Sequence, residues 1–182
     1  MKILNVSDDE KQIAITGITG VEIEDINKTL EEMDKIKGDT VFQLFDASKV
    51  AGWRHIYYSS VSALNAVRTG SAVSNHVEVE ALLYASAQDQ ISKAIKIMGV
   101  TRNTKDVALL VIARDPKGTA IRLAQHLGEE KCQVLELDEG KFRHIKEIYG
   151  ISEKAIETLE CDKYEALERL VIEKCVLMPL LR

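Results

Sequence analysis

The sequence has 182 residues, of which 46% are hydrophobic and 29% charged, and 24 Lys and Arg against 29 Asp and Glu give a net charge of -5. These values are typical of a globular chain with a packed core and unlike those of disordered or fibrous chains. An acidic balance provides no overall positive field for nonspecific nucleic-acid binding. Any RNA site must therefore be a local patch.

The cysteines indicate a reducing environment. Cys132, Cys161 and Cys175 are odd in number, widely spaced and without a Cys-x-x-Cys pair, so we expect free thiols and no metal site. The start of the chain is polar, and no run reaches the ~20 apolar residues of a membrane span. We expect a cytoplasmic protein without membrane contact.

The first half of the chain alternates between strand and helix signals. Residues 3–6 and 12–16 predict a β-hairpin around Ser7 to Asp9, and apolar residues spaced by three or four predict a helix over 23–36 that stops at Gly38. A strand follows at 41–45. Further helices are predicted over residues 55–67, which carry no charge, and over 77–87 and 90–98.

In the second half, the continuous apolar run 107–113 predicts a strand buried on both faces. Asp115 and Pro116 predict the N-cap and first turn of a helix that Gly128 ends. We expect a last short strand at 134–137, then helices over 141–149, from Ser152 and over 162–177. The sequence thus predicts one α/β (α+β) domain over residues 1–182, with a small mixed sheet of about four strands flanked by several helices.

Catalytic motifs are absent from the sequence. It lacks phosphate-binding loops, the dinucleotide-binding glycine pattern, a Gly-x-Ser-x-Gly elbow and a His-Glu-x-x-His helix. The histidines have no partner close in sequence, which favours structural or surface roles and predicts that the protein is not an enzyme. Two alternatives stay open: a Cys–His hydrolase that uses Cys132 or Cys175, and a ligand-binding domain or enzyme with a cleft near His55 and Gln88.

Two surfaces are candidates for binding partners. Lys93 and Lys96 share one helix face, which suits either phosphate contacts or ordinary solvation. Residues 175–181 are apolar on every side, which exceeds the need of one core-facing stripe. That excess favours a partner surface, although core packing alone or a closed homodimer are alternatives.

Motifs in the middle of the chain resemble those of one family. Their order is Phe45-Asp46-Ala47, Gly52-Trp53-Arg54-His55, Val79-Glu80-Ala81-Leu82-Leu83, residues 85–91 and residues 94–100. Together they resemble the kinase-binding subunit of the KEOPS complex, which makes the threonylcarbamoyladenosine of transfer RNA. The resemblance implies a small α/β domain without catalysis, cofactor or metal, which binds the small lobe of an atypical protein kinase and, in archaeal members, the single-stranded acceptor end of transfer RNA.

The resemblance and the residue patterns together nominate site residues. Kinase contacts are expected at Leu170, Lys174, Leu177, Met178 and Leu181. RNA contacts are expected at Arg54, His55, Gln88, Gln90, Lys93 and Lys96. Ala87 and Asp89 depart from the Gly and Arg of the family motif, and the negative charge of Asp89 repels phosphate where an Arg attracts it.

Overall fold

The computed structural model describes residues 1–6 and 10–181, with the backbone alone for Leu181, and the turn predicted at Ser7 to Asp9 lies outside this description. The chain forms two compact units. The first contains residues 1–48 and 99–135, and the second contains residues 49–98 and 136–182. The predicted α/β class is confirmed, whereas the single domain over residues 1–182 stays a prediction.

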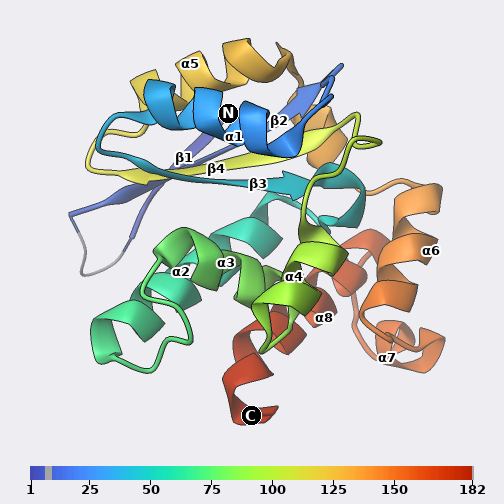
Figure 1. The fold of residues 1–182 in the computed structure, drawn as a ribbon. Coiled ribbons are helices and arrows are strands. Elements are labelled where there is room, and N and C mark those ends of the chain that lie inside the picture. Colours follow the sequence, from blue (N-terminus) through green and yellow to red (C-terminus); the bar gives the residue numbers. More distant parts are fainter. Residues whose placement is uncertain (7–9, 182) are drawn as a thin grey trace. The chain divides into compact units, whose positions relative to one another are not determined.

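The first unit is built on an antiparallel sheet (Figure 1). Its strands are β1 (Lys2–Asn5), β2 (Gln12–Thr19), β3 (Val41–Asp46), β4 (Val107–Ala113) and the short β5 (Glu129–Glu130). The strand order is β1-β2-β4-β3, and β5 pairs with the end of β2. Every pairing in the described sheet is antiparallel, so the expectation of a mixed sheet is wrong on this point. The predicted hairpin of the first two strands is confirmed.

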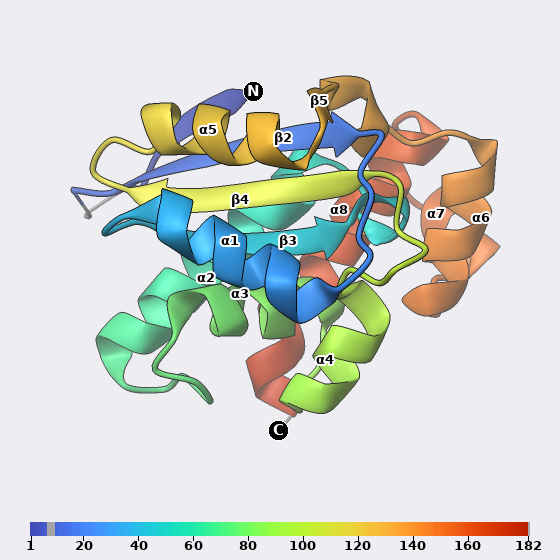
Figure 2. The same cartoon turned by 45° about the horizontal axis from the view of Figure 1, so that its top comes forward.

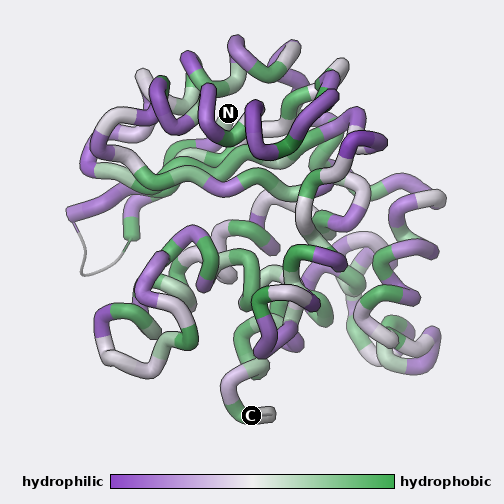
Figure 3. The backbone as a smooth tube through the Cα atoms, viewed as in Figure 1, coloured by the Kyte–Doolittle hydropathy of each residue, from purple (hydrophilic) through white to green (hydrophobic). Residues whose placement is uncertain are grey.

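Two helices cover one face of this sheet, as Figure 2 shows for α1 (Ile26–Lys37) and α5 (Lys117–Leu127). Met33 of α1 and Leu123 of α5 are wholly buried in one cluster with the strand residues Leu109 and Val111. In Figure 3 the strands are mostly hydrophobic along their length, whereas hydrophobic and hydrophilic residues alternate along the two helices. Each helix can therefore turn its hydrophobic residues toward the sheet. Strand β4 is buried from Val107 to Ile112, which confirms the strand predicted from the continuous apolar run.

The predicted strand over residues 134–137 is wrong. The chain there forms a short 3₁₀ helix, η2 (Cys132–Leu135), after Lys131 N–H donates to the Gly17 carbonyl oxygen at 2.8 Å. A Cβ at Gly17 would lie only 2.6 Å from the Lys131 carbonyl oxygen, so this glycine allows the turn to approach β2. Val134 and Leu135 therefore pack against the sheet as a turn, which a strand-like run of apolar residues does not reveal.

The second unit is helical. It contains α2 (Trp53–Thr69), α3 (Val77–Ser86), α4 (Ile91–Met98), α6 (Glu139–Ile148), α7 (Glu153–Glu157) and α8 (Lys163–Leu177), followed by η3 (Met178–Leu181). A turn, η1 (Ala47–Lys49), leads into it from β3. Buried residues of α6, α7 and α8 form one apolar cluster around Ile145, Leu167 and Val171. Among the described residues, no helix is both long and apolar enough to cross a membrane.

Side-chain caps fix several of the helix starts. Asp25, Asp138, Ser152 and Asp162 each accept hydrogen bonds from backbone N–H groups of the first turn. Helix α1 therefore begins at Ile26, three residues later than the predicted 23–36. Helix α5 differs by one residue, because Pro116 occupies the N-cap position that we expected for Asp115.

Candidate functional site

His55 lies at the centre of a buried polar cluster in the second unit. Its Nδ1 accepts the Ala51 N–H at 3.2 Å, so the ring proton is on Nε2, which faces the Ala85 carbonyl oxygen at 2.9 Å. The Tyr149 hydroxyl donates to the same oxygen at 2.6 Å, and the Cys175 thiol lies 3.5 Å from it. His55 thus ties the start of α2 to the end of α3.

The chemistry of this cluster argues against a catalytic pair of Cys175 and His55. Burial lowers the pKa of His55 to about 4, against the opposing effect of the hydrogen bond to Ala85. Burial also raises the pKa of the Cys175 thiol. A protonated thiol therefore faces the N–H side of a neutral imidazole, which cannot accept its proton. His55 is wholly buried, so its ring is out of reach of RNA in this structure.

The start of α2 depends on a residue of α8. Gly52 is the N-cap, with φ 140°, and has no side chain to cap the helix. Glu168 of α8 fills this place, so closely that a Cβ on Gly52 would collide with its carboxylate. The Arg54 guanidinium binds the same carboxylate at 3.1 Å. The Gly-Trp-Arg-His motif therefore joins α2 to α8, and a negative charge lies where the helix dipole favours one.

Glu168 is nearly buried, and burial raises the pKa of its carboxyl group while Arg54 acts to lower it. Sequence reasoning missed Glu168, because 114 positions separate it from Arg54 and it lies in a charged stretch that is typical of a solvated helix face. The sequence did contain one signal for such a residue: Gly52 has no side chain that could cap α2, so a group from elsewhere had to take that place.

The predicted RNA residues fall into two groups. Gln90, Lys93 and Lys96 are exposed at or on α4, and Gln88 before it is half-buried and donates to the Ser86 carbonyl oxygen at 3.4 Å. Arg54 lies on α2, half-exposed beside Glu168. The structure thus brings together the residues of the α3–α4 link and of α4.

The link between α3 and α4 explains the glycine of the family motif. Ala87 ends α3 with φ 51°, a left-handed conformation that favours glycine. Its backbone N–H closes α3 onto Tyr84. The turn therefore forms here with an alanine, at a cost in backbone strain, and the departure at this position leaves the turn in place. Asp89 is exposed beside Gln90.

Helix α4 also carries an apolar edge that sequence reasoning missed. Ile91 and Ile95 are 40% and 54% exposed, one turn apart, whereas Ala94 and Met98 are wholly buried. The helix predicted over residues 90–98 did not separate the buried pair from the exposed one.

Helix α8 divides its apolar residues between core and surface. Leu167, Val171, Cys175 and Met178 follow each other at helical spacing and are all buried. Met178 is 2% exposed and continues the core stripe, and its role as a kinase contact stays a prediction. Val176 and Leu177 are each 42% exposed and Leu180 is 77% exposed. The end of the chain is therefore apolar on its exposed side, in addition to the stripe that the core uses.

The exposed side of α8 forms one wall of a groove of about 300 Å³. Leu170, Lys174 and Leu177, three of the predicted kinase contacts, line it together with Glu173. Gly150, Ile151, Ser152 and Ala155 form the facing wall, from the link between α6 and α7 and from α7 itself. The side chain of Leu181, the remaining predicted contact, lies outside the described residues.

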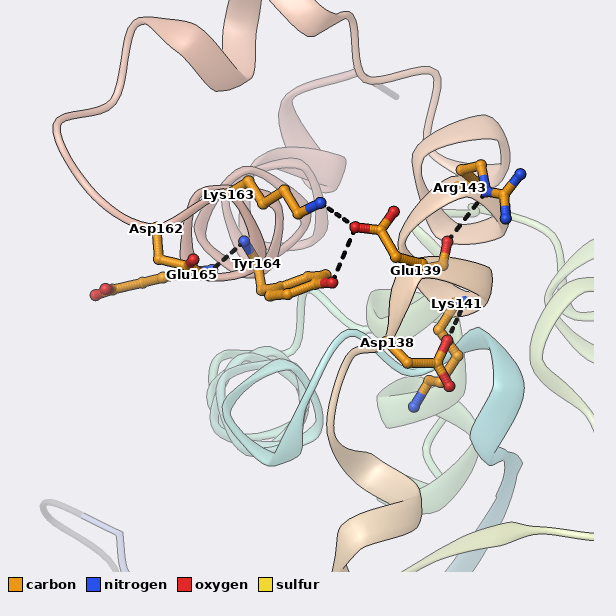
Figure 4. A network of polar contacts seen from close by, with 8 residues as sticks. All are labelled: Asp138, Glu139, Lys141, Arg143, Asp162, Lys163, Tyr164 and Glu165. Atoms are coloured by element: carbon orange, nitrogen blue, oxygen red, sulfur yellow. Dashed lines mark hydrogen bonds and ion pairs between the residues drawn. The ribbon is translucent and has the colours of Figure 1, made fainter.

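Polar contacts join the starts of α6 and α8 (Figure 4). Lys163 forms an ion pair with Glu139, and the Tyr164 hydroxyl donates to the same carboxylate at 3.1 Å. The Lys163 ammonium also lies 5.3 Å from the ring centre of Phe142, a buried residue of α6. These contacts join the start of α8 to the start of α6.

The described residues contain no group of three or more His, Cys, Asp or Glu side chains that could hold a metal ion.

Comparison with known proteins identifies the family. Residues 5–178 match the family model of the kinase binding protein CGI-121. The regulatory protein Cgi121 of Methanocaldococcus jannaschii is 34% identical over 111 residues, which cover 60% of this chain and 70% of the relative. The chain therefore belongs to the CGI-121 family of kinase binding proteins.

Proposed function

We propose that this chain is a non-catalytic regulatory subunit of the KEOPS complex, which binds the small lobe of the atypical kinase and helps recruit the acceptor end of transfer RNA for threonylcarbamoyladenosine synthesis. The groove beside α8 is the observation that carries the kinase part. It combines apolar walls with the exposed side chain of Leu177 and the half-buried side chain of Leu170, in a family of kinase binding proteins.

The groove suits one apolar anchor side chain of the kinase. Leu170 and Leu177 provide apolar surface seven residues apart on α8, and a volume of about 300 Å³ is large enough for a leucine or phenylalanine side chain. Lys174 is exposed at the rim, where an acidic residue of the kinase would pair with it. Leu177 is exposed in the free subunit, so its burial against the kinase would contribute to the free energy of binding.

The kinase proposal is tested with Leu177→Asp in pull-down and calorimetric titration against the purified kinase. An unpaired charge buried in an interface costs several kcal/mol, so binding should weaken by at least about a hundredfold. Val73→Asp is the matched control, because Val73 is 48% exposed and lies outside the groove. A folded Leu177→Asp protein that binds the kinase with wild-type affinity would disprove the docking site. Met178→Asp should instead destabilise the fold.

For RNA, we propose contacts at Gln90, Lys93 and Lys96, with Gln88 at the turn and Arg54 on α2. An exposed helix with two ammonium groups suits phosphates, and the amides before it suit the edges of unpaired bases. A local site of this kind is compatible with a net charge of -5. His55 contributes to it only by holding α2 and α3.

The RNA proposal is tested by gel shift and polarisation with intact transfer RNA and with RNA trimmed of its single-stranded end. Charge reversal at Lys93 and Lys96 should weaken binding and reduce the salt slope by about two contacts. Asp89→Arg should strengthen binding, because it replaces repulsion by attraction. Equal binding of intact and trimmed RNA by the wild-type protein would remove the acceptor-end function and leave kinase binding.

A catalytic role for the isolated chain is not part of this proposal. The cluster around His55 is closed to solvent and holds the proton on the wrong ring nitrogen for a thiol partner. Hydrolase or transferase turnover by the purified chain that is lost in Cys175→Ala would contradict the proposal. A closed homodimer through the α8 groove, measured by sedimentation, would favour an oligomerisation module instead.

A further inference from the structure

A second cavity in the helical unit, distinct from the α8 groove, lies between α2 and α8. It has a volume of about 340 Å³ and is lined by Arg54, Tyr58, Glu165, Glu168, Arg169 and Ile172. Tyr58 is 45% exposed, an unusual position for a large ring in a chain with few aromatic residues. The cavity therefore has both polar and apolar walls, and it has no lining residue in common with the groove beside α8.

An aromatic row along α2 reaches this cavity at Tyr58, the member of the row that lines it. The Arg54 guanidinium lies 5.1 Å from the ring centre of Trp53, Trp53 lies 6.5 Å from Tyr57, and Tyr57 lies 5.2 Å from Tyr58. Interleaved arginine and aromatic side chains of this kind are how proteins hold unpaired bases, since every base offers a flat face for stacking. Ile172 adds an apolar wall from α8.

The two guanidinium groups of the cavity are held differently. Arg54 binds the nearly buried Glu168, which fixes it in place. Arg169 binds Glu165 at 2.6 Å on the same helix, and both side chains are exposed, with 60% and 44% of their surface accessible. Exposed pairs of this spacing contribute little stability, so Arg169 and Glu165 are available to turn toward a ligand.

The charges indicate the class of ligand. Two arginines and two glutamates balance, so the cavity as a whole does not select a lone anion. It offers donors from Arg169, acceptors from Glu165 and an aromatic face from Tyr58. A planar neutral ring with both donors and acceptors along one edge fits this set, and nucleobases have this property.

We propose that the cavity between α2 and α8 takes one unpaired nucleobase of bound RNA, stacked on Tyr58, with its hydrogen-bonding edge at Arg169 and Glu165. This inference rests on the proposed binding of the RNA acceptor end. It adds a base-reading site on the α2–α8 side to the phosphate contacts proposed on α4.

The test measures polarisation of labelled transfer RNA, intact and trimmed, with Tyr58→Ala, Tyr58→Phe and Arg169→Gln. Loss of one stacked base corresponds to a roughly tenfold change in affinity, so Tyr58→Ala should weaken binding of intact RNA by that factor and leave trimmed RNA unchanged. Tyr58→Phe keeps the ring and should bind like the wild type. Arg143→Gln is the matched control, because Arg143 is an exposed arginine of α6 outside the cavity.

The outcomes separate this inference from the proposed function. If the wild type prefers intact RNA and Tyr58→Ala keeps that preference in full, the base site is wrong while acceptor-end binding stands. If the wild type does not distinguish the two RNAs, the proposed RNA function itself fails, and the base site with it. Free cytidine and adenosine monophosphates are the second arm. Saturable binding of either, lost in Tyr58→Ala without any effect on RNA, would make the cavity a site for free nucleotides and overturn the inference.

Discussion

Replacing His55 with Gln should make the stability of the fold less dependent on pH below neutrality. In the wild type, burial lowers the pKa of His55 from 6.5 to about 4. The unfolded chain therefore binds a proton in a pH range where the folded chain does not. The stabilisation is complete above pH 6.5 and is lost as the pH falls toward 4. Gln keeps an amide donor for the Ala85 carbonyl oxygen and removes the titration.

The magnitude follows from the two pKa values. With 6.5 in the unfolded chain and about 4 in the folded chain, the contribution of His55 to the free energy of unfolding falls by about 2 kcal/mol between pH 7 and pH 5. The full difference, reached below the folded pKa, is about 3 kcal/mol. A loss of this size is a large fraction of the stability of an ordinary domain.

The assay is urea unfolding followed by circular dichroism at several pH values from 7 to 5, for the wild type, His55→Gln and His144→Gln. His144 is exposed on α6, so its variant should keep the wild-type pH dependence. His55→Gln removes the Ala51 contact and should be less stable at pH 7, but its free energy should then change less on acidification. Equal pH dependence in the wild type and His55→Gln would refute the buried, neutral state of the imidazole. Nitrogen NMR should also show the Nε2–H tautomer.

Three further predictions concern the same helices. Gly52→Ala should destabilise the fold by about 1–3 kcal/mol in thermal or urea unfolding, because φ 140° strains an alanine and its Cβ displaces the Glu168 carboxylate; unchanged stability would show that the close approach does not matter. Arg54→Gln should raise the pKa of Glu168 further and lower the free energy of unfolding by about 1 kcal/mol at neutral pH. The loss is small because solvent screens the half-exposed guanidinium. Arg54→Gln should lower the free energy of unfolding by less when Glu168 is already replaced by Gln. Cys175 should react with a thiol reagent only on unfolding, because it is buried and burial raises its pKa, whereas half-buried Cys161 should react in the folded state; mass spectrometry of timed samples would show the order.

Local patterns predicted most of the elements because their causes are local. The apolar run of β4 and the helical spacing of residues in α1 and α8 depend on neighbours within a few positions of the chain. The stop at Gly38 is likewise local, since its φ of 59° is one that glycine adopts without strain. The family resemblance also depended on short motifs, and the match over residues 5–178 confirms a kinase binding protein family, whereas membership of the KEOPS complex stays a proposal.

The candidate sites were harder to predict from the sequence, because they depend on residues that are far apart in it. Leu177 and Met178 are adjacent apolar residues, yet one is exposed at the groove and the other is in the core, and only packing around α8 separates them. The strand expected over residues 134–137 failed for the same reason, since the approach of the turn depends on a glycine in β2.

By itself, the sequence determined the α/β class, the positions of the main helices and strands, and the kinase-binding family, since these depend on periodicity, caps and short motifs. Tertiary structure alone decided which apolar side chains face solvent, that His55 is buried, and that Glu168 binds Arg54 at the start of α2 from 114 residues away. The physical reason is that burial and charge pairing are properties of the folded neighbourhood. A residue's own side chain and its neighbours in the sequence do not specify that neighbourhood.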